Sequence, residues 1–268
     1  MRRIRRLKAV HLGIMVICLI LIARECLLSM KHKNEQKNLK AIFEAEENSP
    51  PNGDILSEDS SEPETDILEE PVMQERFKIL YEENSDLVAW LSIDGTVIDY
   101  PVMQCEDDEY YLHHDFYGNE DKYGCLYVRG KADINAGTNF IIYGHNMRDG
   151  SMFGDLDLYK QESYYLEHPL ISFDTLYDEY TYEIIAVFLS QIYNSDDEVF
   201  KYYQFYQADT EEEFDYFYKN IKELSLYDTG VTAEFGDMFL TLSTCAYHVD
   251  DGRFVIVAKR VDEVSGKE

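Results

Sequence analysis

A cysteine, a histidine and an arginine stand at the ends of apolar, β-type runs in this sequence. Cys245 ends the run Phe239–Cys245. His145 follows the run Asn139–Tyr143 after one glycine, and Arg253 opens a further run eight residues after the cysteine. A thiolate can attack a carbonyl, a protonated imidazole can give its proton to the leaving amine, and a guanidinium can stabilise the oxyanion. The residue types and their spacing therefore predict acyl transfer through a thioester.

Each of these residues also has an ordinary structural explanation. A free cysteine on a strand is commonly a core residue, and a single histidine or arginine is commonly held by a hydrogen bond or an ion pair. Among the other histidines, His248 lies three residues after Cys245 and is the second candidate for the base. It stands in a polar turn with nothing to fix its ring. His113 and His114 are explained as exposed polar residues, and His168 as part of a turn.

Many short β-type runs separated by turn residues indicate a closed or nearly closed barrel, because they do not alternate regularly with helices. Asp94 and Gly95, between the first two runs, are a strong hairpin signal. The expected fold class is therefore mainly β. The runs are Ala89–Ile93, Thr96–Val102, Gly124–Val128, Asn139–Tyr143, Leu170–Phe173, Tyr180–Gln191, Asp237–Ser243 and Arg253–Arg260.

Two helices accompany the predicted strands. Pro71 suits the first turn of a helix that would run through Val72–Glu82, where apolar residues recur at helical spacing. Thr210 and Glu213 form a capping box ahead of a second, longer amphipathic segment that precedes the cysteine strand. We expect this long helix to pack on the barrel wall.

The first 30 residues combine a basic start with an apolar run. Arg2–Lys8 contains five basic residues, and Ala9–Ala23 contains no Asp, Glu, Lys or Arg. This run is short for a membrane span, since about 20 residues usually cross the hydrocarbon core, but flanking basic side chains can snorkel. A cleaved signal peptide is the alternative, because the length suits its apolar region. No A-x-A cleavage site follows, so we expect an uncleaved single-pass anchor with its basic end inside.

Residues 31–70 are expected to form an acidic spacer, although residues 31–43 could continue as a helix. From Glu44 to Glu70 the chain has eleven acidic residues, three prolines and little apolar bulk, too little to offset the entropy of ordering. All 22 tyrosines lie at or after Tyr81, and the single tryptophan is Trp90. We therefore expect one folded domain over residues 71–262, with no contribution to its core from residues before 71.

The formal net charge of −29 is unevenly distributed. Residues 1–40 carry ten Lys and Arg against two Glu, which leaves 14 basic and 51 acidic residues in the rest of the chain. Such a body repels phosphate backbones and excludes a nucleic-acid partner. The five cysteines form no CxxC pair and no cluster with zinc-ligand spacing, so no metal site is expected. Cys105 and Cys125 fit small core side chains, and a disulfide between them stays open as an alternative.

Several segments taken together resemble the sortases, and class B sortases in particular. They are Tyr143–Leu156 (YGHNMRDGSMFGDL), Thr241–Cys245 (TLSTC), Asp251–Arg260 (DGRFVIVAKR) and Asn84–Gln104, which is similar to the class B segment leading into the barrel. The resemblance covers residues 71–262 in order and in spacing. It implies an eight-stranded β-barrel with an N-terminal helix and a long helix before the cysteine strand. It also implies an extracytoplasmic domain in a Gram-positive-type bacterium and no required cofactor.

The resemblance also assigns roles by position. His145, Cys245 and Arg253 match the family's catalytic triad. Ser243 matches a position that contacts the sorting peptide in class B enzymes, and Thr244 beside it is our second candidate for substrate binding. Some class B relatives have an acidic residue directly after the cysteine, where this chain has alanine, so a substrate contact through that side chain is not expected.

The reaction implied by the resemblance is transpeptidation at the membrane. The cysteine would cleave a Thr–Gly or Thr–Asn bond in the C-terminal sorting motif, PxTG-like or NPxTN-like, of a secreted protein. An amine of a peptidoglycan precursor or a pilin would then resolve the thioester. Two alternatives stay open at this point: a cysteine protease or amidase that passes the acyl group to water, and a non-catalytic surface-binding module on the same barrel.

Overall fold

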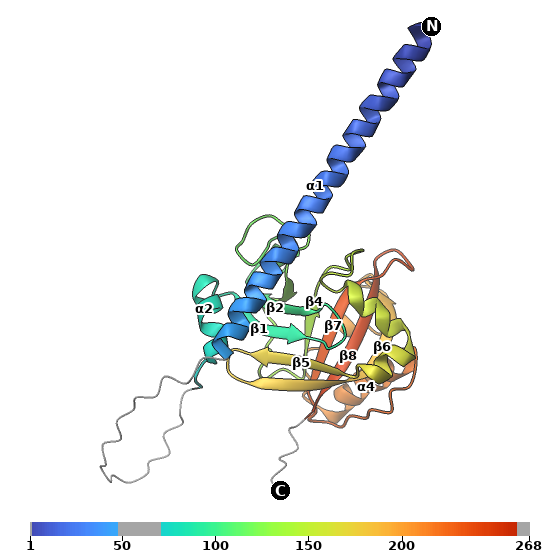
Figure 1. The fold of residues 1–268 in the computed structure, drawn as a ribbon. Helices are drawn as coiled ribbons and strands as arrows, with labels where there is room; N and C mark the ends of the chain where they lie inside the picture. The colour runs from blue at the N-terminus through green and yellow to red at the C-terminus, as the bar shows by residue number, and fades with distance from the viewer. Residues whose placement is uncertain (1, 48–70, 262–268) are drawn as a thin grey trace, which may run out of the picture.

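Eight strands close into a mixed barrel, which confirms the predicted fold class (Figure 1). The computed structural model of the protein describes residues 2–47 and 71–261. Around the barrel the order is β1-β2-β3-β4-β7-β8-β6-β5, with the β2–β3 and β4–β7 pairs parallel. The strands are β1 (Leu87–Ser92), β2 (Asp99–Gln104), β3 (Leu126–Val128), β4 (Asn139–Tyr143), β5 (Leu170–Thr175), β6 (Glu179–Gln191), β7 (Phe239–Cys245) and β8 (Gly252–Val261).

The strands that lead to the predicted site, β4 and β7, are buried on both faces along most of their length. On β4, Phe140 belongs to the cluster that fills the barrel, whereas Ile141 belongs to the cluster on its outer face. On β7, Leu240 likewise belongs to the cluster inside the barrel and Phe239 to the cluster on its outer face. Burial of a strand on both faces holds its ends rigidly, and the site residues are at these ends.

The predicted hairpin joins β1 to β2. The Ile93 N–H donates to Ile98 O at 3.0 Å, and Gly95 has a φ of +83°. A Cβ on Gly95 would lie 2.3 Å from the ring of His168, so this turn needs glycine for its backbone angle and for close packing. His168, at the end of α3 (Glu162–Glu167), is thus a packing partner of the hairpin.

The long helix before the cysteine strand is α4 (Glu211–Leu224), and it begins with the predicted capping box. The Glu213 N–H donates to Thr210 Oγ1 at 3.3 Å, and the Thr210 N–H donates to the Glu213 carboxylate at 3.1 Å. Phe214, Phe217 and Ile221 are buried in the cluster on the outer face of β4, β7 and β8. The helix therefore covers the barrel wall, as expected.

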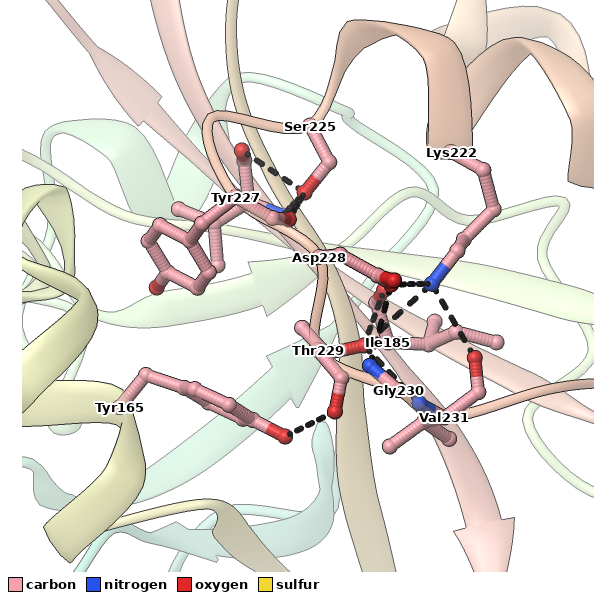
Figure 2. A network of polar contacts seen from close by, with 10 residues as sticks. Tyr165, Ile185, Lys222, Ser225, Tyr227, Asp228, Thr229, Gly230 and Val231 are labelled. Atoms are coloured by element: carbon pink, nitrogen blue, oxygen red, sulfur yellow. Dashed lines mark hydrogen bonds and ion pairs between the residues drawn. The ribbon is translucent and has the colours of Figure 1, made fainter.

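A polar network fixes the end of α4 where the chain turns toward β7 (Figure 2). The Lys222 ammonium contacts Asp228 Oδ1 at 3.0 Å, and Thr229 Oγ1 donates to Ile185 O of β6 at 2.9 Å. The Gly230 N–H and the Lys222 ammonium hold the pKa of Asp228 below its usual value. These contacts fix the connection that leads into the cysteine strand.

The N-terminal helix α1 (Arg2–Glu47) is continuous and extends well beyond the barrel (Figure 1). Among the described residues it is the one helix long and apolar enough to cross a membrane, by length and composition. Residues 31–43, for which a helical continuation was considered, belong to this helix. Residues 44–47 were expected in the unstructured part of the acidic spacer and are helical instead, so the prediction is wrong for these four. Residues 48–70, the rest of that expected spacer, lie outside the described residues.

One face of α1 packs on the folded domain. His32, Gln36, Leu39 and Phe43 are buried along it, and the Phe43 ring stacks on Trp90 with 4.2 Å between ring centroids. The same cluster includes side chains of α2 (Glu75–Glu83), the helix predicted over residues 72–82. The expectation that nothing before residue 71 contributes to the core is therefore wrong. Three short 3-10 helices complete the described elements: η1 (Tyr110–Leu112), η2 (Gly154–Lys160) and η3 (Tyr202–Gln204).

Candidate active site

The hairpin of β7 and β8 brings Cys245 and Arg253 together. The two residues are direct partners in the antiparallel ladder, which places their Cβ atoms about 4.5–5.5 Å apart on one face. The turn between them closes through the Ala246 N–H, which donates to Gly252 O at 2.9 Å. A Cβ on Gly252 would lie 2.2 Å from Ala246 O, so glycine is needed at this point. The turn therefore places Cys245 and Arg253 side by side, as predicted.

The parallel pairing of β4 with β7 adds His145 to this pair. Tyr143 of β4 is the register partner of Ser243 of β7. His145 is two residues after Tyr143, and Cys245 is two residues after Ser243. Side chains two residues apart on a strand point to the same face. The register therefore directs the imidazole and the thiol from adjacent strand ends toward the same side.

Side-chain hydrogen bonds extend this register past the end of β4. Thr244 Oγ1 donates to Gly144 O at 2.7 Å, and Asn146 Nδ2 donates to Cys245 O at 2.9 Å. Asn146 thus ties the segment that carries the histidine to the residue that carries the thiol. This role of Asn146 was not predicted, although the residue directly follows His145.

The imidazole of His145 is held by a main-chain group. Its Nε2 lies 2.8 Å from Leu112 O, at the end of η1. The backbone of the histidine is fixed as well, because the Phe153 N–H donates to His145 O at 2.9 Å. No sequence pattern pointed to Leu112, since a carbonyl acceptor carries no side-chain signature.

A cleft of about 600 Å³ contains all the predicted site residues. It is lined by Asp108, Glu109, Leu112, Tyr127, Arg129, Tyr143, Gly144, His145, Ile192, Tyr203, Ser243, Thr244, Cys245 and Arg253. Arg129 was not predicted as a site residue, and its guanidinium lies 4.9 Å from the centre of the Tyr143 ring.

Burial raises the pKa of Tyr143 and raises that of Tyr127 to about 12, so both phenols stay protonated near neutral pH. They can donate hydrogen bonds but do not compete with the imidazole as bases.

The two predicted substrate-binding hydroxyls are engaged within the protein. Ser243 is 1% exposed, and its Oγ lies 2.7 Å from the buried Tyr202 hydroxyl. Thr244 is 2% exposed and donates to Gly144 O. Both residues line the cleft, but their hydroxyl groups point into the fold.

The remaining histidine and cysteine candidates do not line this cleft. His248 is exposed in the β7–β8 turn and is not among the cleft-lining residues. His113 is exposed, with its ring centroid 6.4 Å from that of His145. Cys105 and Cys125 are free thiols, and only Cys125 is fully buried. Within the described ranges, no group of three or more His, Cys, Asp or Glu side chains is placed to hold a metal ion.

The barrel domain is similar to known proteins. The sortase family, described as a sortase domain, matches residues 91–261. Sortase B of Listeria monocytogenes is 34% identical over 197 residues, which are 70% of this chain and 75% of that protein. Sortase B of Staphylococcus aureus is 30% identical over 192 residues, which are again 70% of this chain and 75% of that protein. A solved structure, sortase B of Bacillus anthracis in complex with AAEK1, has a TM-score of 0.69 at 30% identity and covers 88% of this chain and 100% of its own.

Proposed function

The chain belongs to the sortase family as a class B cysteine transpeptidase, and from this premise we propose that Cys245 is its nucleophile. His145 serves as acid and base, and Arg253 as the cation beside the oxyanion. The observation that carries this assignment is the register of β4, β7 and β8, which sets the three residues at neighbouring strand ends around one cleft.

The first half-reaction forms a thioester. Cys245 gives its proton to His145 and attacks the peptide carbonyl, and a C–S bond forms while the π electrons move to oxygen. The Arg253 guanidinium stabilises this oxyanion. Collapse of the intermediate breaks the C–N bond, and the imidazolium gives its proton to the leaving amine. In the second half-reaction an incoming amine attacks the thioester, loses its proton to His145, and the thiolate leaves.

We propose that the acyl donor is the C-terminal sorting motif of a secreted protein and that the acceptor is an amine of a peptidoglycan precursor or a pilin. An open cleft with apolar and aromatic walls, including Leu112, Tyr143 and Ile192, supports binding of an extended peptide. Arg129 adds a cation beside one aromatic wall. Class B membership supports the sorting-motif substrate.

The N-terminal part of α1 supports a place at the cell membrane. Its residues from His11 to Met30 are almost all exposed, although most of them are apolar. We propose that this part is a single-pass anchor with the catalytic domain on the extracytoplasmic side, as the basic start of the chain favours. Removal of the helix as a signal sequence would leave a shorter mature chain, so the size of the protein in a membrane fraction distinguishes the two.

The proposal is tested with the full-length protein in detergent micelles and two peptides, one PxTG-like and one NPxTN-like. We expect an acyl-enzyme adduct on Cys245 by intact mass spectrometry and none in Cys245→Ala. Adding a peptide with a free N-terminal amine should convert the adduct into a new amide. Cleavage that yields only the free acid in the presence of amine would establish the hydrolase alternative. Absence of both adduct and cleavage with each peptide would overturn the substrate assignment.

A further inference from the structure

The β2–β3 loop (residues 105–125) connects the N-terminal helix to the candidate catalytic histidine. One end of this connection is the Leu112 carbonyl, which lies 2.8 Å from Nε2 of His145. The other end is a set of contacts between the loop and α1. In Figure 1 the green loop lies beside the middle of α1.

The Leu112 carbonyl fixes the tautomer of the histidine. A carbonyl oxygen can only accept, so Nε2 of His145 carries the proton and donates. A neutral imidazole has one N–H, which leaves Nδ1 with its lone pair. In the described part of the chain, no hydrogen bond occupies Nδ1. Nδ1 is therefore the nitrogen that takes the thiol proton and later gives it to the leaving amine, while Nε2 keeps its proton throughout.

The position of that carbonyl depends on close packing within the loop. Gly124 has a φ of +58°, and a Cβ there would lie 2.8 Å from Leu112 O and 2.5 Å from Tyr111 O. The Cys125 N–H donates to Tyr111 O at 2.8 Å. The two ends of the loop therefore lie against each other, and a shift at residues 123–125 moves the Leu112 carbonyl.

The helix α1 holds the same end of the loop. The His32 ring stacks on the Tyr123 ring with 4.2 Å between centroids and 9° between planes. His32 is 1% exposed. Glu25 pairs with Lys122, the residue before this tyrosine. These contacts lie directly beside Gly124, so they constrain the part of the loop that supports the carbonyl.

Two further contacts attach α1 to the rest of the loop. Lys31 Nζ lies 3.6 Å from the buried carboxylate of Asp115. Leu39 of α1 belongs to the same apolar cluster as Tyr111 and Phe116. The helix therefore contacts the loop through charge pairs, a stacked ring pair and a common apolar cluster.

We propose that the segment of α1 from Glu25 to Leu39 is a positioning element for His145, acting through the β2–β3 loop and the Leu112 carbonyl. The inference rests on the proposed function, because it assigns the proton-exchanging nitrogen of the proposed acid. A docked helix keeps the imidazole aimed with Nδ1 toward the cleft. Loss of the helix contacts lets the ring turn and exchange tautomers, so the proton transfer steps lose their geometry while the peptide still binds.

The test compares four variants of the full-length protein in micelles. His32→Ala removes the ring stacked on the loop, and Phe43→Ala is its control, because it removes a stacked ring of α1 that contacts Trp90 instead. Gly124→Ala displaces the Leu112 carbonyl, and Gly118→Ala is its control. Gly118 has a φ of +76° in the same loop, but a Cβ there meets only the end of the Tyr110 side chain.

Two readouts separate positioning from stability. One is kcat and KM for the cleaved peptide at 25 °C, and the other is the ring spectrum of ¹⁵N-labelled histidine, with His145 identified by its loss in His145→Gln. We expect His32→Ala and Gly124→Ala to lower kcat by about 10- to 100-fold, since small misplacements have effects of this size, with KM within about 2-fold. The His145 signals should change from a single Nε2–H tautomer to a mixture. Both controls should keep the wild-type spectrum and kcat, even where their Tm falls.

The outcomes are distinct. If the wild type is active and both His32→Ala and Gly124→Ala keep its kcat and its ring spectrum, the positioning role is overturned and the proposed function stands. If His32→Ala and Phe43→Ala lose kcat equally, in proportion to the fall in their Tm, then α1 contributes only stability. That result would also overturn the positioning role. A wild type without acyl-enzyme would count against the proposed function, while the ring spectrum would still report whether α1 orients His145. If Gly124→Ala fails to fold, as circular dichroism would reveal, His32→Ala alone decides.

Discussion

Arg253 lies directly opposite Cys245 across the β7–β8 ladder, and its Nη1 donates backward to the carbonyls of Asp251 and Gly252 at 3.1 and 3.0 Å. These two bonds fix one edge of the guanidinium at the turn. A guanidinium has five N–H donors, so the others can serve the cleft. The hairpin thus orients the cation and the thiol with one short turn.

Replacing this arginine tests whether its shape matters as well as its charge. Arg253→Ala should lower kcat/KM by roughly 10²–10³-fold, the effect of losing one oxyanion donor. Arg253→Lys should recover only a small part of the lost kcat/KM, because an ammonium cannot bond the turn carbonyls and the oxyanion in the same fork geometry. Arg260→Ala, at the other end of β8, is the control and should keep full activity. Equal rates for Arg253→Lys and wild type would refute the geometric role.

Thiol alkylation should distinguish the cysteines of the barrel domain. Burial raises the pKa of Cys125 well above its usual value, and burial also raises that of Cys105. A raised pKa lowers the thiolate fraction at a given pH, so both should react slowly near pH 7. A small neutral alkylating reagent should therefore modify Cys245 first, as measured by peptide mass spectrometry. Raising the pH should speed the reaction of Cys105, whereas Cys125 should react only after denaturation. Rapid labelling of Cys125 in the folded protein would contradict its burial.

Shortening the chain from the N-terminus tests the contribution of α1 to stability. Deleting residues 1–30 keeps Leu39 and Phe43, whereas deleting residues 1–47 removes both from their buried cluster. Loss of one buried aromatic side chain costs about 3–5 kcal/mol, so the second deletion should lower the free energy of unfolding by at least this amount. Urea unfolding followed by the fluorescence of Trp90, which stacks on Phe43, measures the difference. Identical urea midpoints for the two deletions would show that the helix packs without stabilising the domain.

A double-mutant cycle tests the inward-pointing hydroxyl of Ser243. Tyr202→Phe leaves this buried hydroxyl without its partner, which should cost about 1–3 kcal/mol. Burial raises the pKa of Tyr202 to about 12, so the pair is neutral at working pH and its coupling should not change between pH 6 and 9. Tyr202→Phe combined with Ser243→Ala should be more stable than Tyr202→Phe alone, because no unpaired hydroxyl remains. If Ser243→Ala instead raised KM with no change in Tm, the hydroxyl would contact the substrate as first expected.

The barrel and the assembly of its site were predictable because their signals are local. The short β-type runs, the capping box at Thr210 and the Gly95 turn are each encoded in a few neighbouring residues. The contact face of α1 was also present in the sequence, as a helical stripe of His32, Gln36, Leu39 and Phe43. Two of these four residues are polar, so apolar periodicity alone did not reveal the stripe. The hold of Leu112 on His145 could not be predicted, because it joins a main-chain oxygen to a ring 33 residues away.

With α1 anchored in the membrane as proposed, the pairing of Glu25 with Lys122 would set how far the proposed catalytic groups stand from the lipid. Glu25 lies two residues past Ala23, where the uncharged run ends, and a helix rises about 1.5 Å per residue. With that run in the bilayer, Lys122 lies at the level of the lipid headgroups, and Gly124 beside it touches the carbonyl that holds His145. An extended chain spans about 3.3–3.6 Å per residue. A peptide anchored in the same membrane therefore needs a tether of only a few residues between its own membrane segment and the bond to be cut, and a long stiff spacer would carry that bond past the cleft.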